Sequence, residues 1–530
     1  MKRKRLFALC LTGSLLLAGC TNGAGGPSRG NYEPEEEPTQ APTPTEAPAE
    51  PTEAPTPTEA PPAANDDEFL EFYGWRTGNV YNDPSYGLDV LTVNATHFGM
   101  EKGWEHQNLA NSIGTLSGIY DECVNGAPFE SLKEEVTELN SGQSFPSYYY
   151  EEYETAILRG DMTLCSLVVY SDSYYGGAHD VFNYRAHNYD TETGEELLPK
   201  DVFTDDALDE LPDLLEKSLL EQYDPEIFYD SSKLADTIRT NFESVGEYNF
   251  SLGYEEVTFY FNCYELSPYA AGCQIVRFPY DDYPELVKDK YKSNVKEYIL
   301  PITSQGVYLP GTDEYFNYSA DASPDGEEKL DLYMYINDSE ARRVVDGYSV
   351  KGWLAHVGGE NLFLANVRHI DDYETLQVYK IRSNGMDFIQ EYPVGLNVSM
   401  PLNPHNLALF ETCDLLGTYT IYRYYDLSAD GSIKEKSQTF DFYSPAEYSI
   451  PGFTAKTDLE LPSADGKGKI KIEQYNCLYP YETDNESYVD IFLMDIGDVV
   501  RLTIDDPMSW PRTSNGVEVD DMFDDLPWSG

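Results

Sequence analysis

A histidine and two glycines stand out in the stretch Ser173–His187, SYYGGAHDVFNYRAH, whose residue types can serve acid–base catalysis or metal binding. The glycine pair 176–177 and Ala178 directly precede His179. On one uninterrupted strand, His179 and His187 would share a face but lie far apart, so a metal site would need a third ligand from elsewhere. The simpler interpretation is that the glycines allow a tight turn with positive φ between two strands.

Motifs that usually mark catalysis do not surround this stretch. The seven histidines form no HExxH or HxH pair, and Cys165 and Ser171 stand outside any nucleophile elbow. No cysteine has the CxxC or Cys/His spacing of a zinc site. We therefore expect no metal and no cofactor, with His179 as the one candidate for catalysis if the protein is an enzyme.

The amino terminus predicts export and lipidation. Residues 2–5 are basic, Leu6–Leu17 form a short apolar run, and Leu17-Ala18-Gly19-Cys20 resembles a bacterial lipobox. We expect a signal peptide over residues 1–19, cleavage before Cys20 and a diacylglyceryl thioether on Cys20. The alternative is an ordinary secretory signal with an accidental cysteine. No later stretch is apolar and long enough to span a bilayer, so the expected membrane attachment is lipid alone.

Residues 20–66 predict a stalk that follows the lipidated cysteine. The segment is rich in Pro, Thr, Glu and Ala, and APTPTEAP occurs at Ala41–Pro48 and again at Ala54–Pro61. Such a composition has too little to bury to form a core, and its prolines favour extended polyproline II. At about 3.1 Å per residue, the stalk could reach on the order of 120 Å. The head would then lie at the outer face of the cytoplasmic membrane, in the cell wall or beyond it.

The charge balance limits the partners. With 94 acidic and 35 basic residues, the formal net charge is −59. Nucleic acid and anionic lipid surfaces would be repelled, whereas cationic partners would be attracted. The alternative is that an acidic surface only keeps an exported protein soluble.

Cysteine usage suggests one disulfide. Of eight cysteines, Cys10 would be removed with the signal peptide and Cys20 lipidated. Cys263 and Cys273 flank a turn and could face each other across two strands, which makes them a disulfide candidate in an oxidising compartment. The alternative is that the cysteines are free, buried thiols.

Residues 67–300 predict an α+β domain with a mixed or antiparallel sheet and two to four helices. Apolar residues recur at helical spacing over 105–124 and 207–223, with Pro212 expected in the first turn of the second helix. Strand-like segments lie at 153–161, 164–171, 181–190, 256–262 and 273–278.

Residues 301–518 predict an all-β domain, either a sandwich or a propeller-like fold. Short Tyr-, Val- and Leu-rich runs recur there, and Asp430-Gly431 and Asp465-Gly466 are typical of hairpin turns. Two segments that begin near 360 and 406 are weakly alike, at a spacing within the range of propeller blades. We expect residues 519–530 to form an acidic tail.

Three pieces of the first domain are similar to one family. They are YYGGAH at 174–179, NYDTETGEELLPKDVF at 188–203 and YELSPYAAGCQIVRFPYDDYPELV at 264–287. Over about residues 86–298 the chain resembles the RsiV-like extracytoplasmic domain, which is shared by the lysozyme-sensing anti-sigma-V factor, the amino-terminal parts of some peptidoglycan deacetylases and many bacterial lipoproteins. The matching motif residues are Gly176, Gly177, Ala178, His179, Pro268, Tyr269 and Gly272. Asp180 stands where the family commonly has another glycine.

The resemblance implies an α+β binding module at the cell envelope, since the deacetylase chemistry resides in a separate domain. With no cytoplasmic segment and no transmembrane helix expected, no sigma factor is expected as a partner. We therefore expect a non-catalytic binding or sensing module whose partner is a cationic protein such as lysozyme, or peptidoglycan. One alternative is an accessory peptidoglycan or glycan-processing enzyme that works through His179 and nearby carboxylates. Another is a carbohydrate-binding module that uses some of the 44 tyrosines.

Overall fold

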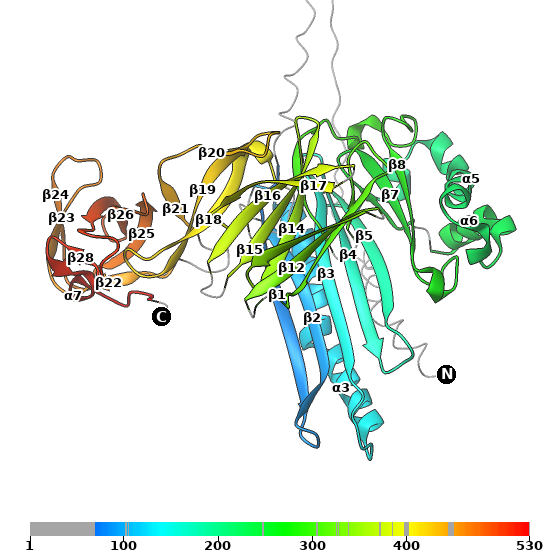
Figure 1. The fold of residues 1–530 in the computed structure, drawn as a ribbon, viewed down its shortest axis with the longest axis horizontal. Helices are drawn as coiled ribbons and strands as arrows, with labels where there is room; N and C mark the ends of the chain where they lie inside the picture. The colour runs from blue at the N-terminus through cyan, green and yellow to red at the C-terminus, as the bar shows by residue number, and fades with distance from the viewer. Residues whose placement is uncertain are drawn as a thin grey trace, which may run out of the picture. The chain divides into compact units, whose positions relative to one another are not determined.

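The computed structural model describes most of the chain after the expected stalk. The described residues are 69–528, apart from 101, 102, 104, 246, 247, 304, 305, 325, 327, 338, 370–372, 384, 397–401 and 444–449. All described residues belong to one unit, Asp66–Gly530 (Figure 1). The expected signal peptide, Cys20 and nearly all of the stalk lie outside the described residues.

A five-stranded sheet begins the described chain, in the order β1-β2-β3-β4-β5. Its strands are β1 (Phe72–Asp83), β2 (Leu88–Met100), β3 (Tyr149–Gly160), β4 (Leu164–Tyr175) and β5 (Val181–Asp190). All neighbours are antiparallel except β2 and β3, which are parallel. The chain crosses between these two through α2 (Gln107–Asn125) and α3 (Ala127–Asn140), as a parallel pair requires.

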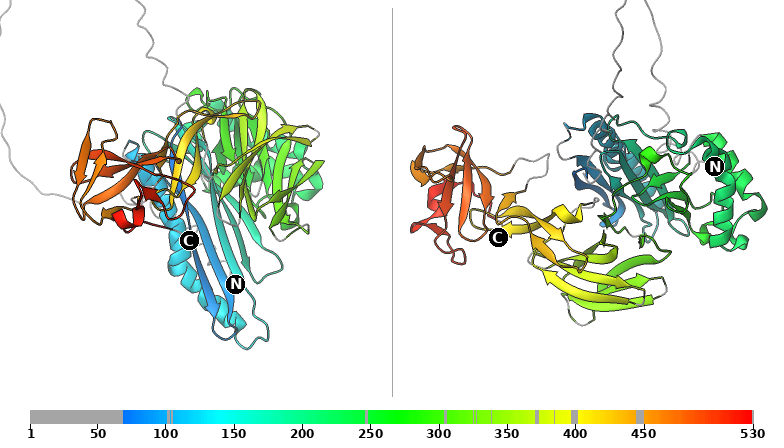
Figure 2. Two further views of the ribbon diagram at one scale, coloured as in Figure 1. Left: turned by 60° about the vertical axis from the view of Figure 1, so that its left-hand side comes forward. Right: turned by 90° about the horizontal axis from the view of Figure 1, so that it is seen from above.

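The two crossover helices cover one face of this sheet (Figure 2). Leu109, Ile113 and Leu116 recur at helical spacing on α2 and are buried against β1, β2 and β4. Residues 164–170 of β4 are buried on both faces of the sheet, because the opposite face is covered as well. Aromatic side chains of β4 and β5 there meet Tyr260, which belongs to a second sheet.

The second sheet is antiparallel and three-stranded, with strands β6 (Phe250–Leu252), β7 (Glu256–Phe261) and β8 (Gln274–Pro279). Helices α4 (Pro199–Val202), α5 (Asp205–Gln222) and α6 (Leu234–Val245) precede it, and Leu211, Leu215 and Leu219 of α5 lie in its core. The first-turn position expected for Pro212 is wrong, because α5 already begins at Asp205 and places Pro212 in its interior.

Among the described residues, short 3-10 helices lie at η1 (Pro225–Ile227), η2 (Ser231–Lys233), η3 (Tyr269–Ala271), η4 (Asp289–Tyr291) and η5 (Pro404–Asn406).

Side-chain amides join the two sheets along the outer edge of β5. Asn262 accepts the Tyr184 N–H at 2.7 Å and donates to the Tyr184 carbonyl at 3.1 Å. Asn249 donates to the same carbonyl at 2.8 Å and accepts the Ala186 N–H at 2.9 Å. The backbone groups that an edge strand would otherwise present are therefore paired by side chains at these positions.

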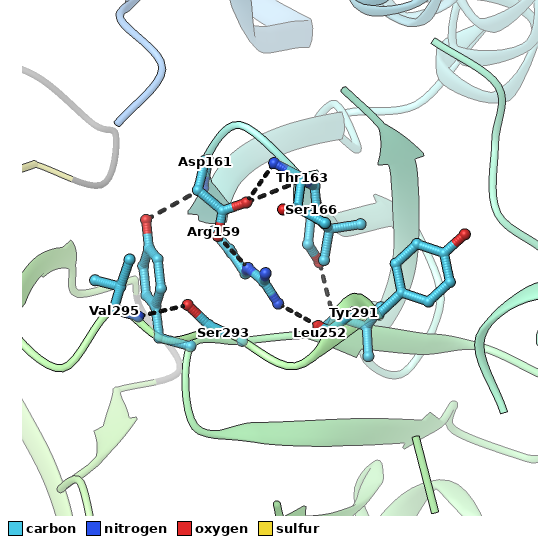
Figure 3. Close-up of polar contacts among 12 residues, drawn as sticks. Arg159, Asp161, Thr163, Ser166, Leu252, Tyr291, Ser293 and Val295 are labelled. Atoms are coloured by element: carbon cyan, nitrogen blue, oxygen red, sulfur yellow. Dashed lines mark hydrogen bonds and ion pairs between the residues drawn. The ribbon is translucent and has the colours of Figure 1, made fainter. Parts of the chain in front are cut away.

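A buried ion pair fastens the β3–β4 turn to a later segment (Figure 3). Arg159 Nε lies 2.6 Å from Asp161 Oδ2, and the two side chains are 1% and 7% exposed. Asp161 Oδ1 also accepts the N–H groups of Thr163 and Leu164, both at 2.9 Å. Arg159 Nη1 donates to the Tyr291 carbonyl at 2.6 Å, so the charges are paired and further hydrogen-bonded.

The rest of the described chain is predominantly β. A four-stranded sheet contains β10 (Val307–Tyr308), β11 (Tyr315–Ala322), β12 (Lys329–Ile336) and β13 (Ser339–Asp346). A five-stranded sheet, in the order β17-β16-β15-β14-β9, contains β9 (Tyr298–Pro301), β14 (Ser349–Val357), β15 (Glu360–Arg368), β16 (Glu374–Arg382) and β17 (Gly385–Tyr392). Because β9 pairs with β14, the boundary expected after residue 300 falls inside a strand of this sheet.

These two sheets share one core, in which Phe316 and Leu332 meet Leu354 and Phe363. The opposite face of the five-stranded sheet packs against β18 and β19 through Leu407, Leu409 and Leu427, among others. The described strands after residue 298 thus form stacked sheets, and no propeller is found among them.

A nine-stranded sheet follows, with β18 (Leu407–Cys413), β19 (Tyr419–Leu427), β20 (Ile433–Glu435), β21 (Phe440–Phe442), β22 (Phe453–Ala455), β25 (Cys477–Thr483), β26 (Tyr488–Leu493), β27 (Asp498–Thr503) and β30 (Phe523–Asp524). Two small ribbons are β23 (Leu459–Pro462) with β24 (Lys469–Ile472), and β28 (Thr513–Ser514) with β29 (Val517–Glu518). The expected acidic tail is in part folded, since α7 (Val519–Met522) and β30 bury Val519, Met522 and Phe523. These apolar residues explain why the segment packs despite its aspartates.

Candidate functional site

The GGAH turn forms the tip of the β4–β5 hairpin. Tyr175 ends β4, Val181 begins β5, and residues 176–179 between them are exposed. Gly176 has φ +68°, in the left-handed region that favours glycine, whereas Gly177 has no positive φ, so the role expected of the pair falls to Gly176 alone. The corner that Gly176 allows leaves His179 exposed.

Both ring nitrogens of His179 have hydrogen-bond partners. Nδ1 lies 2.6 Å from the carbonyl oxygen of Asp180, which can only accept, so Nδ1 carries a proton. In the neutral imidazole, Nε2 is then the acceptor for the Tyr264 hydroxyl, 3.2 Å away. The ring also stacks on Tyr269 with centroids 3.6 Å apart and planes inclined by 14°. His179 is thus held between two tyrosines.

Two carboxylates beside this stack accept tyrosine hydroxyls. Asp180 accepts the Tyr269 hydroxyl at 2.5 Å. The Tyr150 hydroxyl has one proton to donate, and it lies 3.2 and 3.3 Å from the two oxygens of Asp172 and 3.5 Å from Asp180 Oδ2. Burial is the largest cause that raises the pKa of Asp172, and the nearby Asp180 and Glu152 raise it further. The hydrogen bond to Asp180 raises the pKa of Tyr269 to about 12, so its hydroxyl stays protonated at neutral pH.

Further tyrosines extend the site along β3 and β4. Tyr174 lies 5.2 Å from Tyr148 and 6.1 Å from Tyr150, measured between ring centroids. Tyr148 is 57% exposed and Tyr264 is 52% exposed, so large ring faces meet solvent. We call this set the aromatic–acidic surface; it consists of Tyr148, Tyr150, Asp172, Tyr174, His179, Asp180, Tyr264 and Tyr269.

The segment of residues 264–272 supplies the other half of this surface. Pro268, Tyr269 and Gly272 belong to the turn between β7 and β8, with Gly272 at φ +70°. A Cβ on Gly272 would meet nothing within 4 Å, so the backbone conformation rather than space calls for glycine there. Tyr264 has φ +69°, which is rare for a residue with a side chain and often marks a functional turn. The two motifs, far apart in the sequence, thus meet at one place.

Cys263 and Cys273 lie next to this surface. Their Sγ atoms are 3.3 Å apart, and both residues are thiols in the structure. Burial and the adjacent Cys263 raise the pKa of Cys273 to about 12. The other thiols described are Cys123, Cys165 and Cys413, which are buried, and Cys477, which is half-buried.

His187 does not join His179. It is 8% exposed, and its Nδ1 lies 2.7 Å from Glu196 Oε1, while its Nε2 is buried without a partner. Burial opposes ionisation of Glu196, but the hydrogen bond and charge of His187 lower the pKa of this carboxyl. His187 thus belongs to the interior of the domain.

Within the described ranges, no group of three or more His, Cys, Asp or Glu side chains could hold a metal ion. The two best-formed hollows have volumes of only about 30 and 20 Å³. They are lined by residues such as Asn241 and Glu265, or Arg185 and Glu196, and each has room for one or two waters at most. The aromatic–acidic surface contributes no residue to either hollow.

In the described part of the chain, no helix is long and apolar enough to cross a membrane.

Sequence reasoning identified His179, Pro268, Tyr269 and Gly272 but missed the contacts among them. Tyr150, Asp172 and Tyr264 were not singled out as site residues, because only the fold brings their strands and turn together. The clusters YYYEEYE and SYYGG were a partial signal, since both supply tyrosines to the surface.

Part of the α+β region is similar to proteins of a known family. Residues 200–281 match the family described as "Protein of unknown function (DUF3298)", a range that runs from α4 to the end of β8. Two similar solved structures are a member of this family from Bacteroides fragilis and a DUF3298 family protein from Pseudomonas aeruginosa PAO1. The first is 21% identical over 42% of this chain and 94% of that one, and the second is 13% identical over 44% and 100%. Both have a TM-score of 0.30. No curated protein matches the chain.

Proposed function

We propose that the chain is a bacterial cell-surface lipoprotein whose head binds a cationic protein, such as lysozyme, through the aromatic–acidic surface. One observation carries the proposal: two of the three pieces of the RsiV-like resemblance, 174–179 and 264–287, meet and together present tyrosines and carboxylates to solvent. Residues 200–281, which match DUF3298, include Tyr264 and Tyr269 of the later piece.

The chemistry of the surface suits lysine and arginine side chains. Exposed tyrosine faces attract cations, and aspartates next to them add charge-assisted hydrogen bonds. The hydroxyls of Tyr150 and Tyr269 fix the Asp172 and Asp180 carboxylates in place. Binding a partner would therefore cost little additional side-chain entropy at these two residues. The net charge of −59 would also speed the approach of a basic partner.

The arrangement favours binding over catalysis. The hydroxyl that donates to Nε2 of His179 belongs to Tyr264, and, among the described residues, none of the hydrogen bonds to this histidine comes from a serine, threonine or cysteine nucleophile. The surface is also open to water, whereas a glycan-processing site would enclose the scissile bond. The enzyme alternative predicts release of muropeptides from purified walls and loss of that release in His179→Ala.

A carbohydrate-binding role is the second candidate, and the tyrosine group Tyr148, Tyr150 and Tyr174 favours it. Sugar rings stack on exposed aromatic faces and bond to neighbouring carboxylates. Binding on a glycan array without turnover, lost in Tyr148→Ala, would support it over protein binding.

In this proposal, the lipid on Cys20 and the stalk over residues 20–66 hold the head outside the cytoplasmic membrane. No sigma factor is a partner, and the membrane is contacted through the anchor alone.

The test is calorimetric titration of the chain with a basic lysozyme at physiological salt. We expect Tyr264→Ala to weaken binding by about tenfold or more, as for an aromatic anchor at an interface. Tyr481→Ala is the matched control, since Tyr481 is 56% exposed against 52% for Tyr264 and lies on β25. Binding that is absent, or that equals the binding of any basic protein and disappears at modest salt, would refute the proposal.

A further inference from the structure

Cys263 and Cys273 stand at the two ends of the turn that carries Tyr264 and Tyr269. Cys263 lies two residues after the end of β7, and Cys273 directly precedes β8. The last paired residues of these strands are Phe261 and Gln274, so the two cysteines lie just beyond the ladder, offset from each other by one position. Their Sγ atoms are 3.3 Å apart.

This separation is that of two thiols in contact. A disulfide bond is about 2.0 Å long, so a small rotation of the two side chains would bring the sulfurs to bonding distance. The strand pairing already holds the two backbones close together, and closing the bond would therefore require little backbone movement.

Hydrogen bonds hold the turn between the cysteines only in part. Asn262 N–H donates to Glu265 Oε2 at 2.9 Å, and Gln274 Nε2 donates to the Gly272 carbonyl at 2.6 Å. However, Ser267 Oγ and Gln274 Oε1 are buried without a partner. Tyr264 in addition has a positive φ, which costs conformational energy. A disulfide between the two ends of such a turn would restrict its conformations and so stabilise it.

We propose that Cys263 and Cys273 form a disulfide in the oxidising envelope, and that this bond stiffens the turn of residues 264–272. The inference rests on the proposed function in two respects: the head must lie outside the cytoplasmic membrane, and this turn is half of the aromatic–acidic surface. The stiffened turn would hold Tyr264 and Tyr269 against His179 before a partner arrives.

The oxidant is a disulfide of the envelope, either a small molecule or a thiol–disulfide oxidoreductase. One thiol loses its proton and attacks that disulfide, which releases one thiol and leaves a mixed disulfide on this chain. The second thiol then loses its proton and attacks the mixed disulfide, which forms the Cys263–Cys273 bond and releases the other thiol. Two thiols are thus oxidised and one disulfide is reduced. Because burial keeps Cys273 protonated at neutral pH, we expect Cys273 to complete the bond rather than start it.

The first measurement is peptide mapping of the full chain after equilibration in oxidised or reduced glutathione. Trypsin leaves both cysteines on one peptide, since no Lys or Arg lies between Arg239 and Arg277. Cleavage after Glu265 separates them. We expect a Cys263–Cys273 cross-link in oxidised buffer only, and Cys477 should remain open to alkylation in both. If both thiols stay alkylatable in oxidised buffer, the inference is wrong.

The second measurement is hydrogen exchange over residues 264–272. We expect exchange there to be about tenfold slower in the oxidised chain than in the reduced chain. The double variant Cys263→Ser/Cys273→Ser should match the reduced chain in either buffer, while Cys477→Ser should behave like the wild type. A cross-link that leaves this exchange unchanged would overturn the stiffening.

Lysozyme binding separates the two proposals. If neither redox form binds a basic lysozyme, the proposed function fails. Peptide mapping and hydrogen exchange then still show whether the disulfide forms and stiffens the turn. If the reduced chain binds as tightly as the oxidised chain, the proposed function stands and the pre-organised turn is refuted.

Discussion

Replacing Arg159 by Met should destabilise the α+β region locally and strongly. The change leaves Asp161 as a buried carboxylate without its cation, and it removes a donor from the Tyr291 carbonyl. Removing one partner of a buried ion pair costs about 3–5 kcal/mol. The carboxylate would keep the N–H donors of Thr163 and Leu164, so we expect a loss of stability at the low end of this range, about 3 kcal/mol.

Hydrogen exchange of the β3 and β4 amides is the appropriate assay, because a chain with several hydrophobic cores need not unfold in one step. A loss of about 3 kcal/mol predicts exchange roughly 100-fold faster in these strands. The β25–β27 amides, which lie in another sheet, should be unaffected.

The matched control is Arg382→Met. Arg382 pairs with Asp387 at 3.3 Å and with Glu360 at 3.6 Å, and its side chain is 44% exposed, so each of these ion pairs is worth under about 1 kcal/mol. If Arg159→Met speeds exchange in β3 and β4 no more than Arg382→Met does in β16 and β17, the buried pair does not hold the β3–β4 turn and the reasoning is refuted.

Two further predictions concern the later part of the chain. His405 is hydrogen-bonded to Glu297 and Asp426, which raises the pKa of His405, while the same contact lowers the pKa of Glu297. Protonated His405 therefore adds stability below about pH 6.5, which is lost as the pH rises through the raised value. Glu297 adds stability above about pH 4.3, which is lost as the pH falls through its lowered value. His405→Gln should lower the free energy of unfolding, measured by urea denaturation, by under about 1 kcal/mol at pH 5.5 and by much less at pH 8. An equal loss at both pH values would contradict this. Phe523→Ala, in the segment expected to be a tail, should cost about 3–5 kcal/mol because Phe523 is 1% exposed, whereas a shift below about 0.5 kcal/mol in thermal unfolding would mean that the segment is not part of the core.

Local patterns predicted those elements whose residues carry a clear period. Leu109, Ile113 and Leu116 predicted α2, and alternating or continuous apolar runs predicted β3, β4 and β5. β1 and β2 were not predicted, because segments such as FYGWRTGNVYND contain Gly, Asn and Asp, which disfavour strands. Their ladder is held by pairing and by helices from elsewhere in the chain.

Sequence motifs identified some residues of the aromatic–acidic surface but not their arrangement. His179 and Tyr269 were recognised in separate motifs, yet nothing in either motif shows that their rings stack. That contact depends on how the β4–β5 hairpin meets the β7–β8 turn, which is a matter of tertiary packing. For the same reason the folded end of the chain was missed: Val519 and Phe523 are apolar, but their burial depends on β22.

The asparagines that pair with the edge of β5 have a consequence for crowding. A lipid anchor would confine many heads to a thin layer above one membrane, where neighbouring chains collide often. An open strand edge in such a layer would recruit neighbouring chains and start aggregation. Because Asn249 and Asn262 pair with both backbone groups of Tyr184 and with the N–H of Ala186, a neighbouring strand cannot use these groups for pairing. If the head is lipid-anchored as proposed, these two side-chain amides would help to keep neighbouring heads apart.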